Sequence, residues 1–367
     1  MINRLLAYIV KHVDRQLFTL VALLLCVGLV TLFSAAGGGD DGFIRVRGQL
    51  ANIAVAFGVM WIAANVPLHY LNRMALPLYV FGLILLVLVD IFGTISNGAQ
   101  RWLSVGFTKF QPSELMKIAL PLMLAWYFDR YEAILRLRNF AVGAILVLVP
   151  VLLIAKQPDL GTALLVSAAG FYVLFLAGLS WKILVGLGLA GSASLPFLWS
   201  MMHDYQRQRV LTLLDPSQDP LGAGYHTIQS TIALGSGGFM GKGWLNGTQA
   251  HLDFLPERTT DFIFAVYAEE FGLIGNVVLI VLFMLVIGRG LVIAANAPTL
   301  FTRLLAGAVT LTFFTYAFVN MGMVSGILPV VGVPLPLISY GGTSLVTILF
   351  GIGLLMSIHT HRRLVQT

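Results

Sequence analysis

Long apolar stretches recur along the whole chain, and they constrain its fold more than any other feature of the sequence. A helix needs about 20 apolar residues to cross ~30 Å of hydrocarbon, where it satisfies its own backbone hydrogen bonds. Charged residues make up only 10% of the chain, against about 25% in soluble domains. The sequence therefore predicts an all-α integral membrane protein, with one polytopic membrane domain over residues 1–367. We expect about ten transmembrane helices, at about 17–36, 49–66, 75–93, 112–128, 140–156, 160–179, 182–202, 261–287, 303–325 and 341–359.

The distribution of Lys and Arg between these stretches predicts the orientation of the chain. With the N-terminus inside, the inner connections carry twelve basic residues against three acidic ones, which is the excess expected of the cytoplasmic side. An even number of spans then places both termini in the cytoplasm. Residues 1–15 combine apolar and basic side chains at helical spacing and predict a short helix in the membrane interface. The net charge of +6 comes from scattered basic residues, so we expect no nucleic-acid partner.

The only sizeable extramembrane segment, 203–260, is predicted to be a large extracytoplasmic loop. Arg207 and Arg209 lie in a stretch with the pattern of an amphipathic helix and are candidates for binding a phosphate. Glycines between 235 and 243 expose backbone N–H groups beside Lys242, which favours an anion site. A plain flexible loop would have the same composition, so both interpretations stay open.

The segment 256–265 joins this polar loop to a predicted membrane helix and places Asp261 at the water–lipid edge. Thr259 and Thr260 are N-cap candidates, and a carboxylate in the first helical turn is favoured by the backbone N–H groups and the helix dipole. Asp261 therefore either caps the helix or acts in catalysis as an ionisable group at the membrane edge. The segment alone leaves both interpretations open.

Other charged side chains lie at the ends of predicted helices or within them. Glu114 and Lys117 are spaced i, i+3 on one helix face, which predicts a structural salt bridge or a catalytic pair. Asp159 follows a very short turn and is a candidate cap for the next helix. Glu269 and Glu270 lie inside a predicted span, where carboxylates are costly, so at least one needs a buried partner or a proton. Lys117 is a candidate for that partner.

The segment 326–340 is unusual because it contains three prolines and two glycines yet is strongly apolar. The prolines prevent a continuous helix. Non-helical backbone is tolerated at membrane depth only where it is buried in protein or lines a cavity. We therefore predict a re-entrant segment before the last helix, whose alternative role is that of a structural plug.

Several motifs together resemble the bacterial shape, elongation, division and sporulation family of polytopic membrane proteins, and the resemblance covers essentially the whole chain. The segments that carry it include Gln111-Pro112-Ser113-Glu114, Asp204-Tyr205-Gln206-Arg207-Gln208-Arg209, Gly222-Ala223-Gly224-Tyr225-His226, Gly235-Ser236-Gly237-Gly238, Pro256-Glu257, Thr260-Asp261-Phe262 and Ile338-Ser339-Tyr340-Gly341-Gly342. Met202-His203-Asp204-Tyr205 and Ser357-Ile358-His359-Thr360-His361-Arg362 resemble the rod-elongation branch more than the division branch.

The resemblance implies a peptidoglycan glycosyltransferase that polymerises lipid II at the outer face of the cytoplasmic membrane during cell elongation and rod-shape maintenance. In such enzymes an acceptor sugar hydroxyl attacks the anomeric carbon of the lipid-linked donor with inversion. Asp261 matches the family's essential aspartate, and its implied role is that of general base. A helix N-terminus would lower the pKa of this carboxyl and desolvation would raise it, and the sequence leaves that question open.

The resemblance also implies residues around the base. Substrate-binding or cavity-shaping roles are implied for Glu114, Lys117, Asp159, Arg207, Arg209, Lys242 and Ser339. The departing undecaprenyl diphosphate needs positive charge, which the basic members of this set would supply. A divalent cation, Mg or Mn, near Asp261 or Asp159 is the other possible source of that charge.

The partners implied by the resemblance are lipid II, an undecaprenyl-diphosphate-linked disaccharide peptide, and a class B penicillin-binding transpeptidase of the penicillin-binding protein 2 type. The elongation-complex proteins MreC, MreD and RodZ are implied in the same way. Two other functions stay open: a lipid II flippase, and a scaffold that only recruits wall-synthesis proteins. No internal repeat of the kind common in transporters is visible, and the polar groups cluster on the outer side, which favours an enzyme.

Overall fold

The computed structural model describes residues 13–96, 99–105, 108–131, 136–202, 207, 210–212, 215–216, 223–252, 254–255 and 257–365. Its helices are α2 (Arg15–Ala35), α3 (Gly39–Asn65), α4 (Leu68–Phe92), α5 (Pro112–Arg130), α6 (Leu137–Lys156), α7 (Leu160–Leu176), α8 (Trp181–Met201), α10 (Ala223–Ser236), α11 (Thr248–His251), α12 (Ile263–Ala295), α13 (Leu300–Val324) and α14 (Thr343–Val365). Residues 1–12 of the expected interfacial helix, and most of the expected helix around Arg209, lie outside the described residues.

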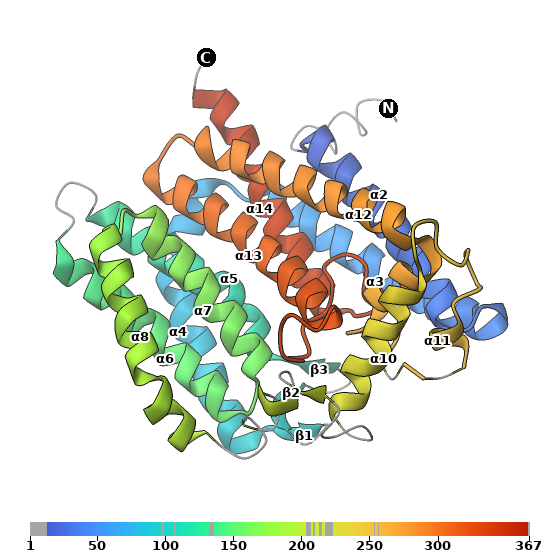
Figure 1. Cartoon of the computed structure of the whole chain (residues 1–367). Coiled ribbons are helices and arrows are strands. Elements are labelled where there is room, and N and C mark those ends of the chain that lie inside the picture. Colours follow the sequence, from blue (N-terminus) through green and yellow to red (C-terminus); the bar gives the residue numbers. More distant parts are fainter. Residues whose placement is uncertain are drawn as a thin grey trace, which may run out of the picture.

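Each of the ten apolar stretches coincides with a helix (Figure 1). Within the part of the chain that the structure describes, seven helices are long and apolar enough to cross a membrane: α2, α3, α4, α6, α12, α13 and α14. Apolar helices α7 and Trp181–Phe197 of α8 are shorter. The 19 residues of α5 include four charged side chains, so this helix lacks the uniform apolarity of the others.

The chain between α4 and α5 contains the only strands among the described residues, which the all-helical prediction did not include. Strands β1 (Thr94–Ser96), β2 (Ala99–Val105) and β3 (Thr108–Phe110) form an antiparallel sheet in the order β1-β2-β3. Thr94 lies opposite Trp102, and Leu103 lies opposite Phe110. The sheet contacts the turn between α6 and α7, where Arg101 Nη2 donates a hydrogen bond of 3.2 Å to the Pro158 carbonyl.

Helix α13 occupies the centre of the bundle and contacts α12, α7, α5 and α14 (Figure 1). In its most apolar part 72% of the residues are buried, against 22% in α6. The outer helices expose large apolar side chains such as Leu148 and Leu152 of α6. In water such surfaces would be unstable, whereas hydrocarbon tolerates them, so the pattern is that of an integral membrane protein.

Helix α12 is broken at Gly272, which corrects the prediction of one continuous span beginning at Asp261. Gly272 has φ 63° and ψ −161°, a conformation that residues with a Cβ rarely adopt. Phe264 and Ile280 would lie about 24 Å apart along a straight helix, yet both line one cavity of about 380 Å³. Helix α12 therefore consists of a short helix, 263–271, and a long helix, 273–295, that meet at a sharp bend.

The segment between α13 and α14 is non-helical from 325 to 342, in agreement with its proline content. Its side chains Val333, Leu335, Leu337 and Ile338 are buried. Its backbone passes so close to Gly28, in the middle of α2, that a Cβ there would lie 2.7 Å from the Leu337 carbonyl oxygen. Gly161 at the start of α7 gives the same close approach to the Val331 carbonyl. The segment is thus packed between helices rather than extended over the surface.

Candidate active site

Asp261 lies in the turn that precedes α12, and it does not cap the helix. The N-cap residue is Phe262, and no side chain makes a cap hydrogen bond there. The turn closes locally, because the Thr260 and Phe262 amides donate to the Glu257 carbonyl at 3.1 and 3.3 Å. Thr260 Oγ1 donates to Glu257 Oε2 at 2.9 Å. The predicted cap at Asp261, Thr259 or Thr260 is therefore wrong.

Asn320 of α13 and the 325–342 segment hold the turn in place. Asn320 Nδ2 donates to the Asp261 carbonyl at 2.8 Å and to the Val333 carbonyl at 2.7 Å. Ser339 Oγ donates to the Thr260 carbonyl at 2.6 Å. Gly332 lies beside the carboxylate, since a Cβ on it would be 3.3 Å from Asp261 Oδ2. Two distant segments thus hold the backbone of the turn that carries Asp261. The cavity-shaping role of Ser339 stays a prediction.

Burial, together with the nearby charge of Glu257, raises the pKa of Asp261 to about 6. The sequence left open whether the helix N-terminus would lower this pKa or desolvation would raise it. Desolvation dominates, because the carboxylate accepts no cap hydrogen bond. A carboxyl with a pKa near 6 is largely ionised at neutral pH and is still basic enough to accept a proton. The electrostatics suit a general base.

His226 and Glu257 are two further titratable residues at this turn, to which the sequence analysis assigned no role. The His226 ring of α10 stacks on Phe262, with centroids 5.7 Å apart and an interplanar angle of 17°. Burial lowers the pKa of His226, although Glu257 opposes this. Its Nδ1 atom is buried without a hydrogen-bond partner among the described residues. Both residues lie in the motifs that carry the family resemblance, which was the available signal.

Glu114 and Lys117 form a buried ion pair with an Oε1–Nζ distance of 2.6 Å. Lys117 Nζ also lies 5.1 Å from the centre of the Tyr316 ring. Glu114 Oε2 is buried without a hydrogen-bond partner in the part of the chain described. Glu114 lines an apolar cavity of about 630 Å³ between α3, α4, α5 and α14. The cavity therefore offers an apolar channel with a carboxylate in its wall.

Asp159 caps α7, as predicted, and links three elements. It accepts hydrogen bonds from the Thr162 amide at 3.1 Å and from Gln111 Nε2 at 3.0 Å. Arg101 of β2 lies 3.8 Å away in an ion pair. Gln111 lines the same cavity as Glu114. The neighbouring Lys156 pairs with Asp90 at 3.4 Å.

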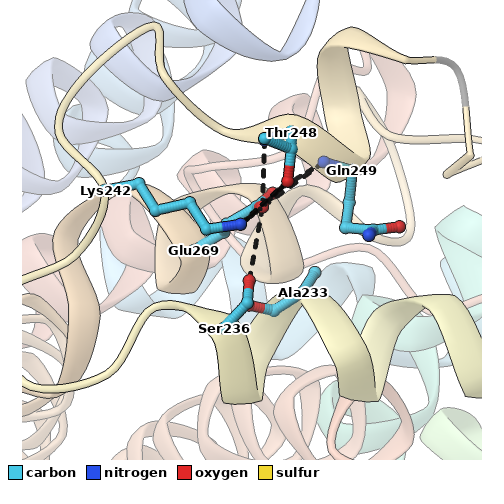
Figure 2. A network of polar contacts seen from close by, with 6 residues as sticks. All are labelled: Ala233, Ser236, Lys242, Thr248, Gln249 and Glu269. Carbon is cyan, nitrogen blue, oxygen red and sulfur yellow. Dashed lines mark hydrogen bonds and ion pairs between the residues drawn. The ribbon is translucent and has the colours of Figure 1, made fainter.

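The described members of the predicted diphosphate-binding cations have different partners. The Arg207 guanidinium donates to the carbonyls of Trp199 at 3.0 Å and Ser200 at 2.8 Å. Lys242 Nζ lies 2.7 Å from Glu269 Oε1 (Figure 2). Glu269 is thus paired with Lys242, whereas Lys117, the candidate partner from the sequence, is paired with Glu114. Arg209 lies outside the described residues.

The described residues contain no group of three or more His, Cys, Asp or Glu side chains arranged to hold a metal ion. Asp261 and Asp159, the two residues predicted to lie near a divalent cation, therefore do not form a complete cation site with their described neighbours. A divalent cation near these residues therefore stays a prediction.

Comparison with known proteins gives consistent matches over the length of the chain. A family model for FtsW, RodA and SpoVE, described as cell cycle protein, matches residues 14–364. The chain is 52% identical over 356 residues to the peptidoglycan glycosyltransferase MrdB of Escherichia coli (strain K12), covering 97% of this chain and 95% of that protein.

Solved structures agree with the sequence matches. One similar chain comes from a peptidoglycan synthase complex that coordinates polymerization and crosslinking, with a TM-score of 0.82, 38% identity and coverage of 95% of this chain and 98% of the other. Another is the rod shape determining protein RodA of Thermus thermophilus, with a TM-score of 0.72, 32% identity and coverage of 95% and 97%. The resemblance predicted from the motifs, including its rod-elongation branch, is confirmed by these matches.

Proposed function

The chain belongs to the FtsW, RodA and SpoVE family and is a peptidoglycan glycosyltransferase, and we propose that it polymerises lipid II with Asp261 as the general base. The observation that carries this proposal is the buried carboxylate with a pKa of about 6, fixed between Gly332 and the turn that Asn320 holds. A sugar hydroxyl is a very weak acid, so its attack needs a base within reach.

In the proposed reaction the acceptor hydroxyl attacks the anomeric carbon of the donor as Asp261 accepts its proton. The new glycosidic bond forms while the bond between the anomeric carbon and the diphosphate oxygen breaks. Undecaprenyl diphosphate leaves with the electron pair, and attack from the opposite face inverts the anomeric centre. Asp261 then returns its proton to water. Burial keeps the carboxylate basic, which supports this step.

The apolar cavity beside Glu114 is the proposed site for part of a lipid chain. Its wall is mostly aliphatic and aromatic, and its volume of about 630 Å³ accommodates several isoprene units. Glu114 and Lys117 shape its polar end, and Asp159 supports that end through Gln111. Arg207 and Arg209 remain the proposed diphosphate ligands on the strength of the family resemblance, whereas Lys117 and Lys242 are each paired with a buried carboxylate.

We extend the proposal to the membrane topology. Ten spans, with both termini in the cytoplasm and the active face outside, follow if α5, α7 and α8 cross the membrane together with the seven longer apolar helices. The 326–340 segment is proposed as re-entrant. Its contact with Gly28, seven residues or ~10 Å from the end of α2, supports this placement.

A class B penicillin-binding transpeptidase is the proposed partner. The support is that a similar chain occurs in a peptidoglycan synthase complex that coordinates polymerization and crosslinking. Newly polymerised glycan must be cross-linked, so such a partner has a chemical reason to be adjacent. Roles with MreC, MreD and RodZ rest on the family resemblance alone.

The test is polymerisation of fluorescent lipid II by the purified protein with its transpeptidase. We expect Asp261→Asn to abolish polymer formation while folding and partner binding persist. Asp40→Asn, an exposed position at the start of α3, is the matched control and should retain activity. Unchanged polymer from Asp261→Asn would contradict the general-base role.

The alternative function of a lipid II flippase is separated by the same pair of variants. A flippase needs no proton acceptor at Asp261, so lipid II movement across a vesicle membrane should be independent of that carboxylate. Transport without any polymer from the unmodified protein and its partner would favour the flippase.

A further inference from the structure

The break in α12 removes two backbone hydrogen bonds of the helix, and residues of the extracytoplasmic loop replace them. In an unbroken helix the carbonyls of Glu269 and Glu270 would accept from the amides four residues later. Here they accept from the amides of Lys242 and Gly243, both at 3.0 Å. The end of helix 263–271 is therefore capped by the loop.

The same loop also caps the long helix 273–295. The Leu273 amide donates to the Gly238 carbonyl at 2.9 Å, and the Ile274 amide donates to the Phe239 carbonyl at 3.2 Å. The loop thus supplies donors to one helix end and acceptors to the other. Orphan groups at a buried helix end are costly, so this loop conformation and the bend stabilise each other.

Glycines allow the loop to approach α12 this closely. A Cβ on Gly237 would collide with the Ala268 carbonyl, and a Cβ on Gly241 would collide with the Glu270 carbonyl. Gly241 also has φ +78°, which favours glycine. Gly237 and Gly241 of the run that suggested an anion-binding loop thus have a structural reason.

The Glu269 carboxylate holds the loop through its side chain as well (Figure 2). It is fully buried and accepts from Lys242 Nζ at 2.7 Å. The Thr248 amide and Oγ1 both donate to it at 2.9 Å, and the Gln249 amide donates at 3.2 Å. Lys242 Nζ also donates to Thr248 Oγ1 at 2.8 Å. A buried charge with this many partners fixes both segments relative to each other.

We propose that Glu269, Lys242 and the loop residues 237–249, which we name the α12 clamp, position Asp261 for catalysis. Asp261 lies in the turn before the short helix, and Glu269 lies six residues, ~9 Å, from the start of that helix. The N-terminal end of that helix has no side-chain cap. Asn320 and Ser339 hold the turn before that end, and the clamp fixes the other end of the helix. In this view Lys242 is a positioning residue rather than a diphosphate ligand, and the inference rests on the proposed role of Asp261.

The test is a double-mutant cycle with Lys242→Met, Glu269→Gln and the combined variant, measured in lipid II polymerisation. Displacement of the base should lower kcat for each single variant by about 10- to 100-fold, with little change in KM. Lys242→Met alone leaves a buried carboxylate without its counter-ion, so adding Glu269→Gln should restore part of the loss. Lys156→Met, which removes an ion pair elsewhere, is the control and should leave kcat unchanged.

Amide hydrogen exchange gives a readout independent of activity. In Lys242→Met, peptides that contain Gly243 and Leu273 should exchange faster than in the parent, and Thr248→Val should give a smaller change of the same kind. If Glu269→Gln fails to fold, these two milder variants carry the test. A raised KM with unchanged kcat in Lys242→Met would show that Lys242 binds the diphosphate and would overturn the proposal.

The outcomes also separate the clamp from the proposed function. Faster exchange in Lys242→Met together with an active Asp261→Asn variant would refute the general base and leave the clamp standing as a structural unit. An inactive Asp261→Asn variant, with parental kcat and exchange in Lys242→Met, would refute the clamp alone. Multiplicative losses in the cycle would likewise refute it, because residues of one clamp should not act independently.

Discussion

Replacement of Asp261 by Asn should abolish polymerisation and at the same time stabilise the protein at neutral pH. Burial raises the pKa of the Asp261 carboxyl from 3.8 to about 6 in the folded protein. Between pH 3.8 and about pH 6, the folded protein therefore keeps a proton on this carboxyl that the unfolded chain has already released. The free energy of unfolding falls as the pH rises from about 4 to about 6, and it stays at the lower level above that range.

The size of the effect follows from the same difference in pKa. A change from 3.8 to about 6 corresponds to about 3 kcal/mol. The neutral Asn side chain is not subject to this penalty, so Asp261→Asn should gain up to about 3 kcal/mol at pH 7.5. The partial exposure of the carboxylate makes this an upper limit. At pH 4 the parent carboxyl is mostly protonated, and the gain should largely disappear.

Thermal unfolding of the purified protein in detergent measures this prediction. The melting temperature of Asp261→Asn should exceed that of the parent by a few degrees at pH 7.5 and match it near pH 4. Asp40→Asn, at an exposed position, is the control and should have the melting temperature of the parent at pH 7.5. A second check is Glu257→Gln, which removes a charge that raises the pKa of Asp261 and should move the acid limb of polymerisation toward lower pH.

A lower melting temperature for Asp261→Asn at pH 7.5 would refute the reasoning, because it would mean that the ionised carboxylate stabilises the fold. A gain that is the same at both pH values would refute it too, since the effect would then not come from ionisation. Activity that stays constant from pH 7.5 to pH 5 would show that catalysis does not depend on ionisation of the Asp261 carboxyl group.

Two further predictions concern the residues around this base. Ala at Glu114 or at Lys117 leaves a buried charge unpaired and should lower the free energy of unfolding by about 3–5 kcal/mol. A variant in which the two residues are exchanged should recover part of the stability and activity. Thermal unfolding and polymerisation assays of the three variants check this. Gly332→Ala adds a Cβ 3.3 Å from Asp261 Oδ2 at a backbone φ of +72°. It should reduce kcat and lower the free energy of unfolding by about 1 kcal/mol, which the same two assays measure. An unaffected kcat would show that the carboxylate has room to move.

Much of the fold was predictable because membrane helices are specified locally. About 20 apolar residues determine a spanning helix whatever surrounds it, and each predicted stretch is helical in the structure. The proline-rich segment before α14 was identified for a similar reason, since proline excludes a continuous helix on its own. The Glu114–Lys117 pair followed from i, i+3 spacing and is present at 2.6 Å.

The features that the sequence did not specify depend on contacts between distant segments. The bend at Gly272 needs the loop 237–243 to replace the missing helix bonds, and a single glycine inside an apolar stretch does not reveal that. The partner of Glu269 is 27 positions away in a loop, so helical spacing cannot identify Lys242. Likewise, the turn of Asp261 is fixed by Asn320 and Ser339 from later in the chain.

Asp14 shows why the absence of a cap hydrogen bond at Asp261 is important for the proposed chemistry. Both aspartates are partly or fully buried at the start of a helix. Asp14 caps α2, accepting from the Leu17 amide at 2.8 Å and from Arg289 Nη2 at 2.5 Å. Burial alone would raise the pKa of Asp14, yet these hydrogen bonds and the Arg289 charge outweigh it and lower that pKa.

The pKa of Asp261 is raised because burial acts there without compensating donors. A cap donor or an arginine at this turn would stabilise the ionised carboxylate and weaken it as a base. Introducing a cation beside the turn should thus stabilise the protein at neutral pH and slow polymerisation. The ionised carboxylate of Asp261 makes the folded turn less stable and is also more basic. Both effects have one physical cause: the carboxylate is buried, and it accepts no cap hydrogen bond from the helix end.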